Sequence, residues 1–331
     1  MFRRIRPDGF TLLLIGVVVL ATLSPCRGLV ATGFEWATRA AITLLFFMHG
    51  AKLSREAVVR GLGAWRLHLG VAGATFILFP LLGVAVSLLP DGWVSAEVKI
   101  GVLFLCALPS TVQSSIALTA IARGNVAAAV CSASLSNIAG VVLTPLLVGL
   151  MLHAQSEAGG DLLGAIGNVA VTLLAPFVLG HLSRPFTATF VDRHKPLLGR
   201  LDRGSILLVV YTAFSAAVIE GIWTRMTTGD FAVIAVVDVL LLAAVLTLTT
   251  VAARLVGLPV ADEIVLVFCG SKKSLASGVP MAAALFPAAM VGIIIVPLML
   301  FHQLQLIVCA VLARRYAERI EAEPALTHAP T

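Results

Sequence analysis

The feature that most constrains this chain is a succession of long apolar runs separated by short, charged loops. Each run approaches or exceeds the roughly 20 apolar residues that a membrane-spanning helix needs. A backbone in lipid must satisfy its own hydrogen bonds, so we predict that each run is a helix. The ten runs cover residues 10–24, 36–51, 67–89, 98–122, 125–152, 162–182, 204–223, 231–253, 262–286 and 289–312.

The composition agrees with a bilayer as the solvent. Of the 331 residues, 59% are hydrophobic and 12% are charged, about half the charged fraction of a typical soluble domain. So few charges cannot cover a water-facing surface. The net charge of +6 would suit nucleic acid, but the positions of the basic residues do not. We therefore expect the lipid bilayer and a small solute as partners and no nucleic acid, with a homodimer left open.

The positions of the basic residues predict the orientation of the spans. With the N-terminus in the cytoplasm, 17 of the 23 Lys and Arg residues fall in cytoplasmic segments, as the positive-inside rule requires. One missed span would invert every later loop and remove this asymmetry. We predict a multi-pass protein of the inner or plasma membrane, both termini cytoplasmic, ending in a polar cytoplasmic tail over residues 316–331.

The first run has an alternative interpretation. A basic start followed by an apolar stretch over residues 10–24 also describes a secretory signal peptide. Pro25 stands where cleavage would fall, and no small-x-small site follows cleanly. A spanning helix is therefore favoured.

Five spans in each half give the two halves opposite orientations. If the halves are homologous, residues 8–155 and 160–315 form inverted repeats, a common transporter architecture. The fifth spans of the two halves share one spacing, Gly140 to Pro145 and Gly292 to Pro297. Ordinary use of Gly and Pro in membrane helices is the alternative explanation for that match.

The fourth span of each half carries a polar cluster near its middle. Pro109 lacks a backbone donor and disfavours helix in the preceding residue, and Gly270 loosens the backbone of the ninth span. We predict that both spans unwind, near residues 110–115 and 270–274, and approach each other at a binding site. The candidate solute- and ion-binding residues are Ser110, Thr111, Gln113, Ser114 and Ser115, together with Ser271, Lys272, Lys273 and Ser274.

Two adjacent lysines, Lys272 and Lys273, lie at mid-span, where a charged side chain raises the free energy of membrane insertion. Each costs roughly 2.5–3.5 kcal/mol near the membrane centre on insertion scales, and neighbours on a helix point about 100° apart. We interpret them as a positively charged site that favours an anion or replaces a bound cation. The alternative is a misplaced ninth span with both lysines in a cytoplasmic loop.

Other polar side chains carry weaker signals. Ser132, Ser136 and Asn137 in the fifth span are further candidates for the same cavity, although membrane serines more often pack between helices. Ser134, two residues from both serines, is expected to face elsewhere. Glu220 and Asp238 are expected toward helix ends, at the interface. Interhelical hydrogen bonds are expected for His302, Gln303 and Gln305.

Several segments resemble the bile acid:sodium symporter superfamily, and within it the SBF-like branch. They are residues 46–50 with 53–54, Pro109 with Ser114 and Ser115, residues 122–125 and residues 143–145. The resemblance implies an all-helical fold of ten spans in two inverted five-helix repeats. Spans one, two, six and seven would form a panel, and the others a core with broken fourth and ninth spans that cross at the midplane. Solute would bind in the crevice between panel and core.

The same resemblance places sodium ligands where this chain lacks them. The hydroxyl positions of the fifth span fall on Ala129 and Ala133, and the acid of the ninth span falls near Val267. Only Ser114 and Ser115 resemble the family's sodium-binding residues. Sodium at that pair is the one metal considered, and no other cofactor is expected.

We therefore expect a secondary transporter that moves a small organic anion by alternating access, coupled to sodium or protons. A cation/proton antiporter is one alternative, although the fourth, fifth, ninth and tenth spans hold no acid at mid-depth. A regulatory or sensor membrane protein that keeps the fold is another. An enzyme is not expected, because the chain lacks HExxH, GxSxG and Walker motifs.

Overall fold

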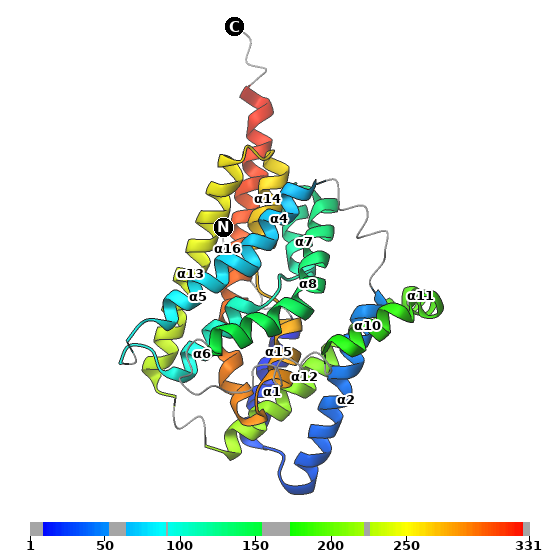
Figure 1. Cartoon of the computed structure of the whole chain (residues 1–331). Helices are drawn as coiled ribbons and strands as arrows, with labels where there is room; N and C mark the ends of the chain where they lie inside the picture. The colour runs from blue at the N-terminus through cyan, green and yellow to red at the C-terminus, as the bar shows by residue number, and fades with distance from the viewer. Residues whose placement is uncertain (1–8, 53–63, 91, 154–172, 222–225, 327–331) are drawn as a thin grey trace.

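The computed structural model describes residues 9–52, 64–90, 92–153, 173–221 and 226–326, and these residues form helices joined by short links (Figure 1). In the first half the helices are α1 (Gly9–Leu23), α2 (Gly28–Lys52), α4 (Trp65–Gly73), the π-helical η2 (Ala74–Leu78), α5 (Phe79–Ser87), α6 (Ala96–Ala107), α7 (Gln113–Ile121) and α8 (Val126–His153). In the second half they are α10 (Ala175–Leu182), α11 (Arg184–Arg193), α12 (Lys195–Ile219), α13 (Thr228–Leu255), α14 (Val260–Gly270), α15 (Leu275–Leu285) and α16 (Ala288–Leu326).

Several of these helices have the length and composition to cross a membrane. Five such spans lie within the described residues: Trp65–Ser87, Val126–Leu152, Lys195–Ile219, Thr228–Leu255 and Ala288–Ile320, and a shorter apolar helix covers Leu12–Leu23. The described residues therefore agree with the expected all-helical fold and include helices that fit a membrane. The expected fourth and ninth spans are each divided into two short helices, and residues 162–172 of the expected sixth span lie outside the described residues.

Two glycines allow α2 and α10 to pack at backbone distance. A Cβ atom added to Gly50 would lie 1.9 Å from the carbonyl oxygen of Phe177, and one added to Gly180 would lie 1.9 Å from that of Phe47. Small residues permit such close helix approach in membranes. Gly50 belongs to the segment that carries the family resemblance. The close packing of α2 against α10 explains why a glycine stands at this position.

The helices form two neighbouring groups. In the smaller group α12 contacts α1 and α2, and α2 contacts α10, while α4 to α8 and α13 to α16 make up the larger group. Helix α12 contacts α15 and α16, and so joins the two groups.

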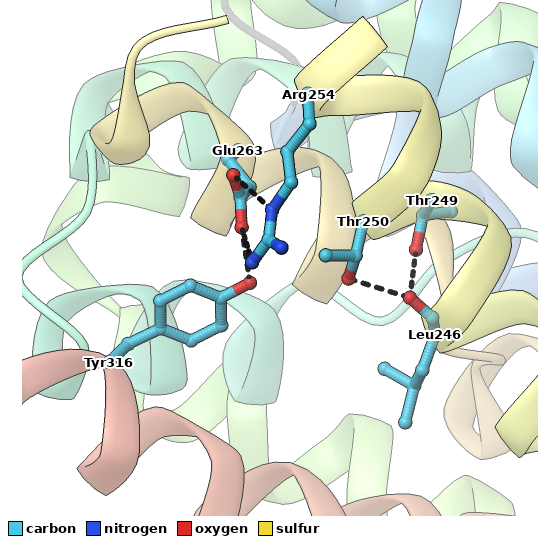
Figure 2. Close-up of polar contacts among 6 residues, drawn as sticks. All are labelled: Leu246, Thr249, Thr250, Arg254, Glu263 and Tyr316. Atoms are coloured by element: carbon cyan, nitrogen blue, oxygen red, sulfur yellow. Dashed lines mark hydrogen bonds and ion pairs between the residues drawn. The ribbon is translucent and has the colours of Figure 1, made fainter. Parts of the chain in front are cut away.

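Helix α16 continues where a polar tail was expected. It runs to Leu326 and its end projects beyond the other helices (Figure 1). Tyr316 is buried, and its hydroxyl donates to Glu263 Oε1 at 2.8 Å. The same carboxylate pairs with Arg254 at 3.4 Å (Figure 2). These contacts link α13, α14 and α16. At least the start of the expected tail therefore belongs to the folded core.

The position of Asp238 differs from the one expected. It was expected at a helix end and the interface, but at 1.5 Å per residue it lies about 5 Å from the middle of α13. Its side chain is 1% exposed, and neither carboxylate oxygen has a hydrogen-bond partner among the described residues. Position along an apolar run did not reveal which neighbours would cover it.

Candidate functional site

The first interruption covers residues 108–112, between α6 and α7. Leu108 has an extended backbone, with φ −73° and ψ 154°, as expected for a residue before proline. The expected unwinding near residues 110–115 is therefore confirmed in part. The break starts at Leu108, and the helix resumes at Gln113, so Ser114 and Ser115 are helical.

The second interruption covers residues 271–274, between α14 and α15, as expected. Ser274 caps α15: its Oγ accepts the backbone N–H of Ser277 at 3.1 Å. Hydroxyl side chains at this position satisfy orphan donors of the first helical turn. The new helix can therefore begin inside the protein at little cost.

The two interruptions are in direct contact, which confirms their predicted approach. The backbone N–H of Ser274 donates to the carbonyl of Pro109 at 2.9 Å. Ser115 Oγ donates to the carbonyl of Phe268 at 3.1 Å. The first bond joins the two interruptions directly, and the second joins the flanking helices α7 and α14, so these buried polar groups have partners.

A side chain from the next long helix clamps each interruption. In the first, Asn137 on α8 donates to the carbonyl of Ser110 at 2.8 Å, and Ser136 Oγ accepts the Ser110 N–H at 3.0 Å. In the second, Gln305 on α16 accepts the Lys273 N–H at 2.8 Å and donates to the Lys273 carbonyl at 3.0 Å. The expected interhelical role of Gln305 is confirmed.

Lys273 is fully buried within a cage of carbonyl oxygens. Its Nζ donates to Thr75, Cys106 and Leu108 at 2.9, 2.8 and 2.7 Å. It also lies 4.1 Å from the centroid of the Phe79 ring, a favourable contact for a cation. The three donors of an ammonium group are therefore all used.

The sequence next to Thr75 explains why its carbonyl is available. In the π-helical turn, the Phe79 N–H bonds to the carbonyl of Ala74, five residues back. The same register would pair the Thr75 carbonyl with Pro80, which has no N–H. Pro80 thus leaves a carbonyl for Lys273, and π-turns of this kind are frequent at functional sites.

Lys272 is equally buried but has fewer contacts. Its Nζ donates to the carbonyl of Ser114 at 3.1 Å and lies 5.3 Å from the centroid of the Phe268 ring. Thr111 Oγ1 lies 2.7 Å from Ser114 Oγ and 3.0 Å from Ser115 Oγ. An ammonium group therefore lies at the serine pair considered for sodium.

A crevice lies beside the interruptions, between α2 and α12 on one side and α7, α8 and α15 on the other. Its larger part encloses about 740 Å³ and an overlapping part about 330 Å³, a volume typical of small-molecule sites. Of the predicted residues, those that line it are Thr111, Gln113, Ser114, Asn137 and Ser274.

Seven predicted residues do not line the crevice; they are Ser110, Ser115, Ser132, Ser136, Ser271, Lys272 and Lys273. They are buried behind its wall. On α8 Asn137 lines the crevice as expected. Ser134, expected to face elsewhere, lines it too, whereas Ser132 lies 2.7 Å from His68 Nδ1. The two lysines bond to backbone carbonyls behind the crevice wall and do not form its surface.

Charged residues that the sequence did not single out line the crevice; they are His49, Lys52, Arg200, Asp202 and Arg203. Lys52 at the end of α2 pairs with Asp202 near the start of α12 at 2.5 Å. The ion pair could not be predicted from the sequence because its two residues are far apart along the chain. The one available signal was the position of His49 within the segment that carries the family resemblance.

Comparison with known proteins agrees with this geometry. The profile of the SBF-like CPA transporter family matches residues 8–318. The chain belongs to this family. A protein of Pseudomonas aeruginosa named "Uncharacterized protein" is 56% identical over 99% of this chain and 98% of its own length. "Putative symporter YfeH" of Escherichia coli is 54% identical over 95% of this chain and 94% of its own length.

A more distant relative carries the resemblance to the wider superfamily. "Sodium/bile acid cotransporter 7-B" of Xenopus laevis is 26% identical over 98% of both chains. Family membership confirms the expected resemblance and assigns the chain to transporters rather than enzymes.

Proposed function

We propose that the protein is a secondary transporter that moves a small organic anion by alternating access. The observation that carries this proposal is the crevice of about 740 Å³ between two groups of helices. Its described lining includes the side chains of Lys52, Arg200 and Arg203 against the single carboxylate of Asp202. An excess of fixed positive charge attracts anions and raises their local concentration.

The proposed architecture is ten spans in two inverted repeats, with both termini cytoplasmic. The equivalent clamps of Asn137 and Gln305 on the two interruptions support a repeat, because each comes from the long helix after a broken one. Helices α1, α2, α10 and α12 would be the panel, and the other group the core. The crevice between them is where such a transporter would hold its solute.

We further propose that a lysine replaces the coupling sodium. Lys273 is bonded to three carbonyl oxygens, and Lys272 lies at Ser114 beside Ser115. The positions that the superfamily resemblance assigns to sodium ligands, Ala129, Ala133 and Val267, are buried and carry no side-chain oxygen. An ammonium group can stand for a small cation among such oxygens, so sodium would not be needed for solute binding.

Uptake by reconstituted vesicles tests the function. Vesicles with the purified protein should accumulate radiolabelled succinate or taurocholate above empty vesicles, with and without sodium. Gln113→Leu, at the exposed crevice surface, should lower uptake without a change in Tm. Arg66→Met, exposed outside the crevice, should leave uptake unchanged. Absence of uptake of either anion under proton or sodium gradients would contradict the proposal.

Asp238 supports a second candidate, a cation/proton antiporter. The fourth, fifth, ninth and tenth spans lack a mid-depth acid, but α13 carries this one, buried and without a hydrogen-bond partner among the described residues. Buried acids in membrane helices often serve proton transfer. Dissipation of a vesicle pH gradient by added sodium or potassium, abolished by Asp238→Asn, would favour this function over anion transport.

A further inference from the structure

The ion pair of Lys52 and Asp202 lies in the crevice rather than in the protein core. Lys52 Nζ and Asp202 Oδ2 are 2.5 Å apart, and the side chains are 31% and 23% exposed. The pair links the end of α2 to the start of α12, and both residues line the crevice. A solute in the crevice can therefore reach either partner.

Asp202 is only half satisfied by this pair. Its second oxygen, Oδ1, is buried and has no hydrogen-bond partner within the described residues. A carboxylate accepts up to four hydrogen bonds, and unmade bonds of a buried charged group are expensive. The pair is therefore less favourable than a carboxylate with both oxygens solvated or bonded.

His49 lies within electrostatic reach of both Asp202 and Lys52. Its Nδ1 is 2.7 Å from the carbonyl of Leu45. Because a carbonyl only accepts, Nδ1 carries the hydrogen, which leaves Nε2 as the nitrogen that can bind or release a proton. Histidine and aspartate together give this end of the crevice two groups that can take up a proton.

Among the described residues that line the crevice, the other charged and titratable groups are cationic or histidine. Arg200 and Arg203 line the crevice from α12, His302 lines it from α16, and Arg184 of α11 reaches the backbone carbonyl of Lys52 at 3.4 Å. Described lining residues from α7, α8 and α15 are uncharged, such as Gln113, Asn137 and Ser277. Asp202 is thus the anion around which this cationic end is arranged.

From this geometry, and resting on the proposed transport of anions, we infer that Asp202 occupies the solute's own position on Lys52. The solute is then a small carboxylate, because the group it displaces is a carboxylate. When the solute carboxylate bonds to Lys52, Asp202 loses its ammonium partner beside a second anion. Both changes favour the neutral form of a carboxyl group. Asp202 therefore takes one proton from water, and anion and proton are bound together.

The sign of one substitution separates this exchange from a structural latch. Asp202→Asn removes the competing carboxylate and should tighten binding of succinate to purified protein about tenfold or more, while Lys52→Met should weaken it by a similar factor. Arg66→Met is the control and should change nothing. A latch that only positions α2 against α12 would instead make Asp202→Asn weaken binding. The double variant Lys52→Met with Asp202→Asn should remain folded and bind poorly.

Proton uptake supplies a second readout. Calorimetric titration of succinate in two buffers with different ionisation heats should show uptake of about one proton per succinate in the native protein and none in Asp202→Asn. Equal uptake by both proteins, or no binding of succinate by either, would overturn the inference. Sulfate that binds as tightly as succinate would also overturn the assignment to carboxylates. Vesicle uptake of taurocholate would survive these outcomes, so the proposed function is tested separately.

Discussion

The two helix interruptions are each held by a side chain of the long helix that follows, Asn137 or Gln305, but they differ in backbone conformation and in their side chains. The first, residues 108–112, contains the hydroxyl residues Ser110 and Thr111, and Thr111 lines the crevice. The second, residues 271–274, contains two lysines that are buried behind the crevice wall. The second interruption supplies a positive charge, and the first, with its flanking residues, supplies carbonyl oxygens to receive it. Both breaks thus reach the crevice, through Thr111 and Ser274, and the second also holds two ammonium groups behind its wall.

The largest expected effect is on Lys273. Lys273→Met would leave the carbonyls of Thr75, Cys106 and Leu108 without their shared donor. Leaving buried charged or polar partners unpaired costs about 3–5 kcal/mol, so we expect a large fall in Tm or loss of folded protein. Thermal unfolding of detergent-purified protein measures this. A fall no greater than that of Lys272→Met would contradict the carbonyl cage.

Binding of sodium by the Lys273→Met variant is a second test of the carbonyl cage. Carbonyl oxygens can replace the hydration shell of a small cation, so the vacated cage should bind sodium. Sodium chloride, compared with choline chloride at equal ionic strength, should raise the Tm of Lys273→Met and leave that of the native protein unchanged. An equal response of both proteins would show that the cage is not a cation site.

The two clamps provide the next test. Gln305→Leu would leave the buried N–H and carbonyl of Lys273 unpaired, at a cost of about 2–4 kcal/mol. Asn137→Leu should cost less, about 1–2 kcal/mol, because Asn137 borders the crevice and water can replace it. Urea unfolding monitored by fluorescence can rank them. The reverse order would mean that the first interruption is the more strongly held.

We expect the loss of the Lys272 ammonium group to change ion binding more than it changes stability. Its bond to the Ser114 carbonyl and its contact with Phe268 predict a loss of about 1–2 kcal/mol in Lys272→Met. If it replaces sodium at Ser114 and Ser115, the variant should bind succinate more tightly with sodium than with choline. Sodium-independent binding by this variant would assign the role to Lys273 alone.

The smallest expected effect is a gain. Lys273 is a buried charge with its donors satisfied, whereas Asp238 is a buried acid with neither oxygen bonded among the described residues. Asp238→Leu should raise stability by about 1 kcal/mol, because an unsatisfied polar group is replaced by an apolar one. The Tm should therefore rise slightly. A lower Tm would indicate that Asp238 has a partner in the folded protein.

Local backbone chemistry made the interruptions predictable. Pro109 and Gly270 disturb a helix wherever it lies, so both breaks could be placed from sequence to within a few residues. The bonds of Ser110 to Ser136 and of Lys273 to Gln305 could not be placed, because they depend on which helix packs behind each break.

The crevice was less predictable than the breaks. Lys52 and Asp202 meet across 150 positions of sequence, and positive charges near Lys52 and Arg200 were explained by topology alone. Helical spacing groups Ser132 with Ser136, but it does not say which side of α8 faces the crevice, and Ser134 lines the crevice instead of these two serines. Burial of Asp238 likewise follows from tertiary packing that hydropathy does not contain.

Binding of radiolabelled sodium to purified protein tests the central claim most directly. If a lysine is the built-in cation of the crossed interruptions, the native protein should bind no saturable sodium while it still binds succinate, and Lys273→Met or Lys272→Met should gain saturable sodium binding. Saturable sodium binding by the native protein, unaltered in both variants, would show that the lysines do not stand in the place of the coupling ion.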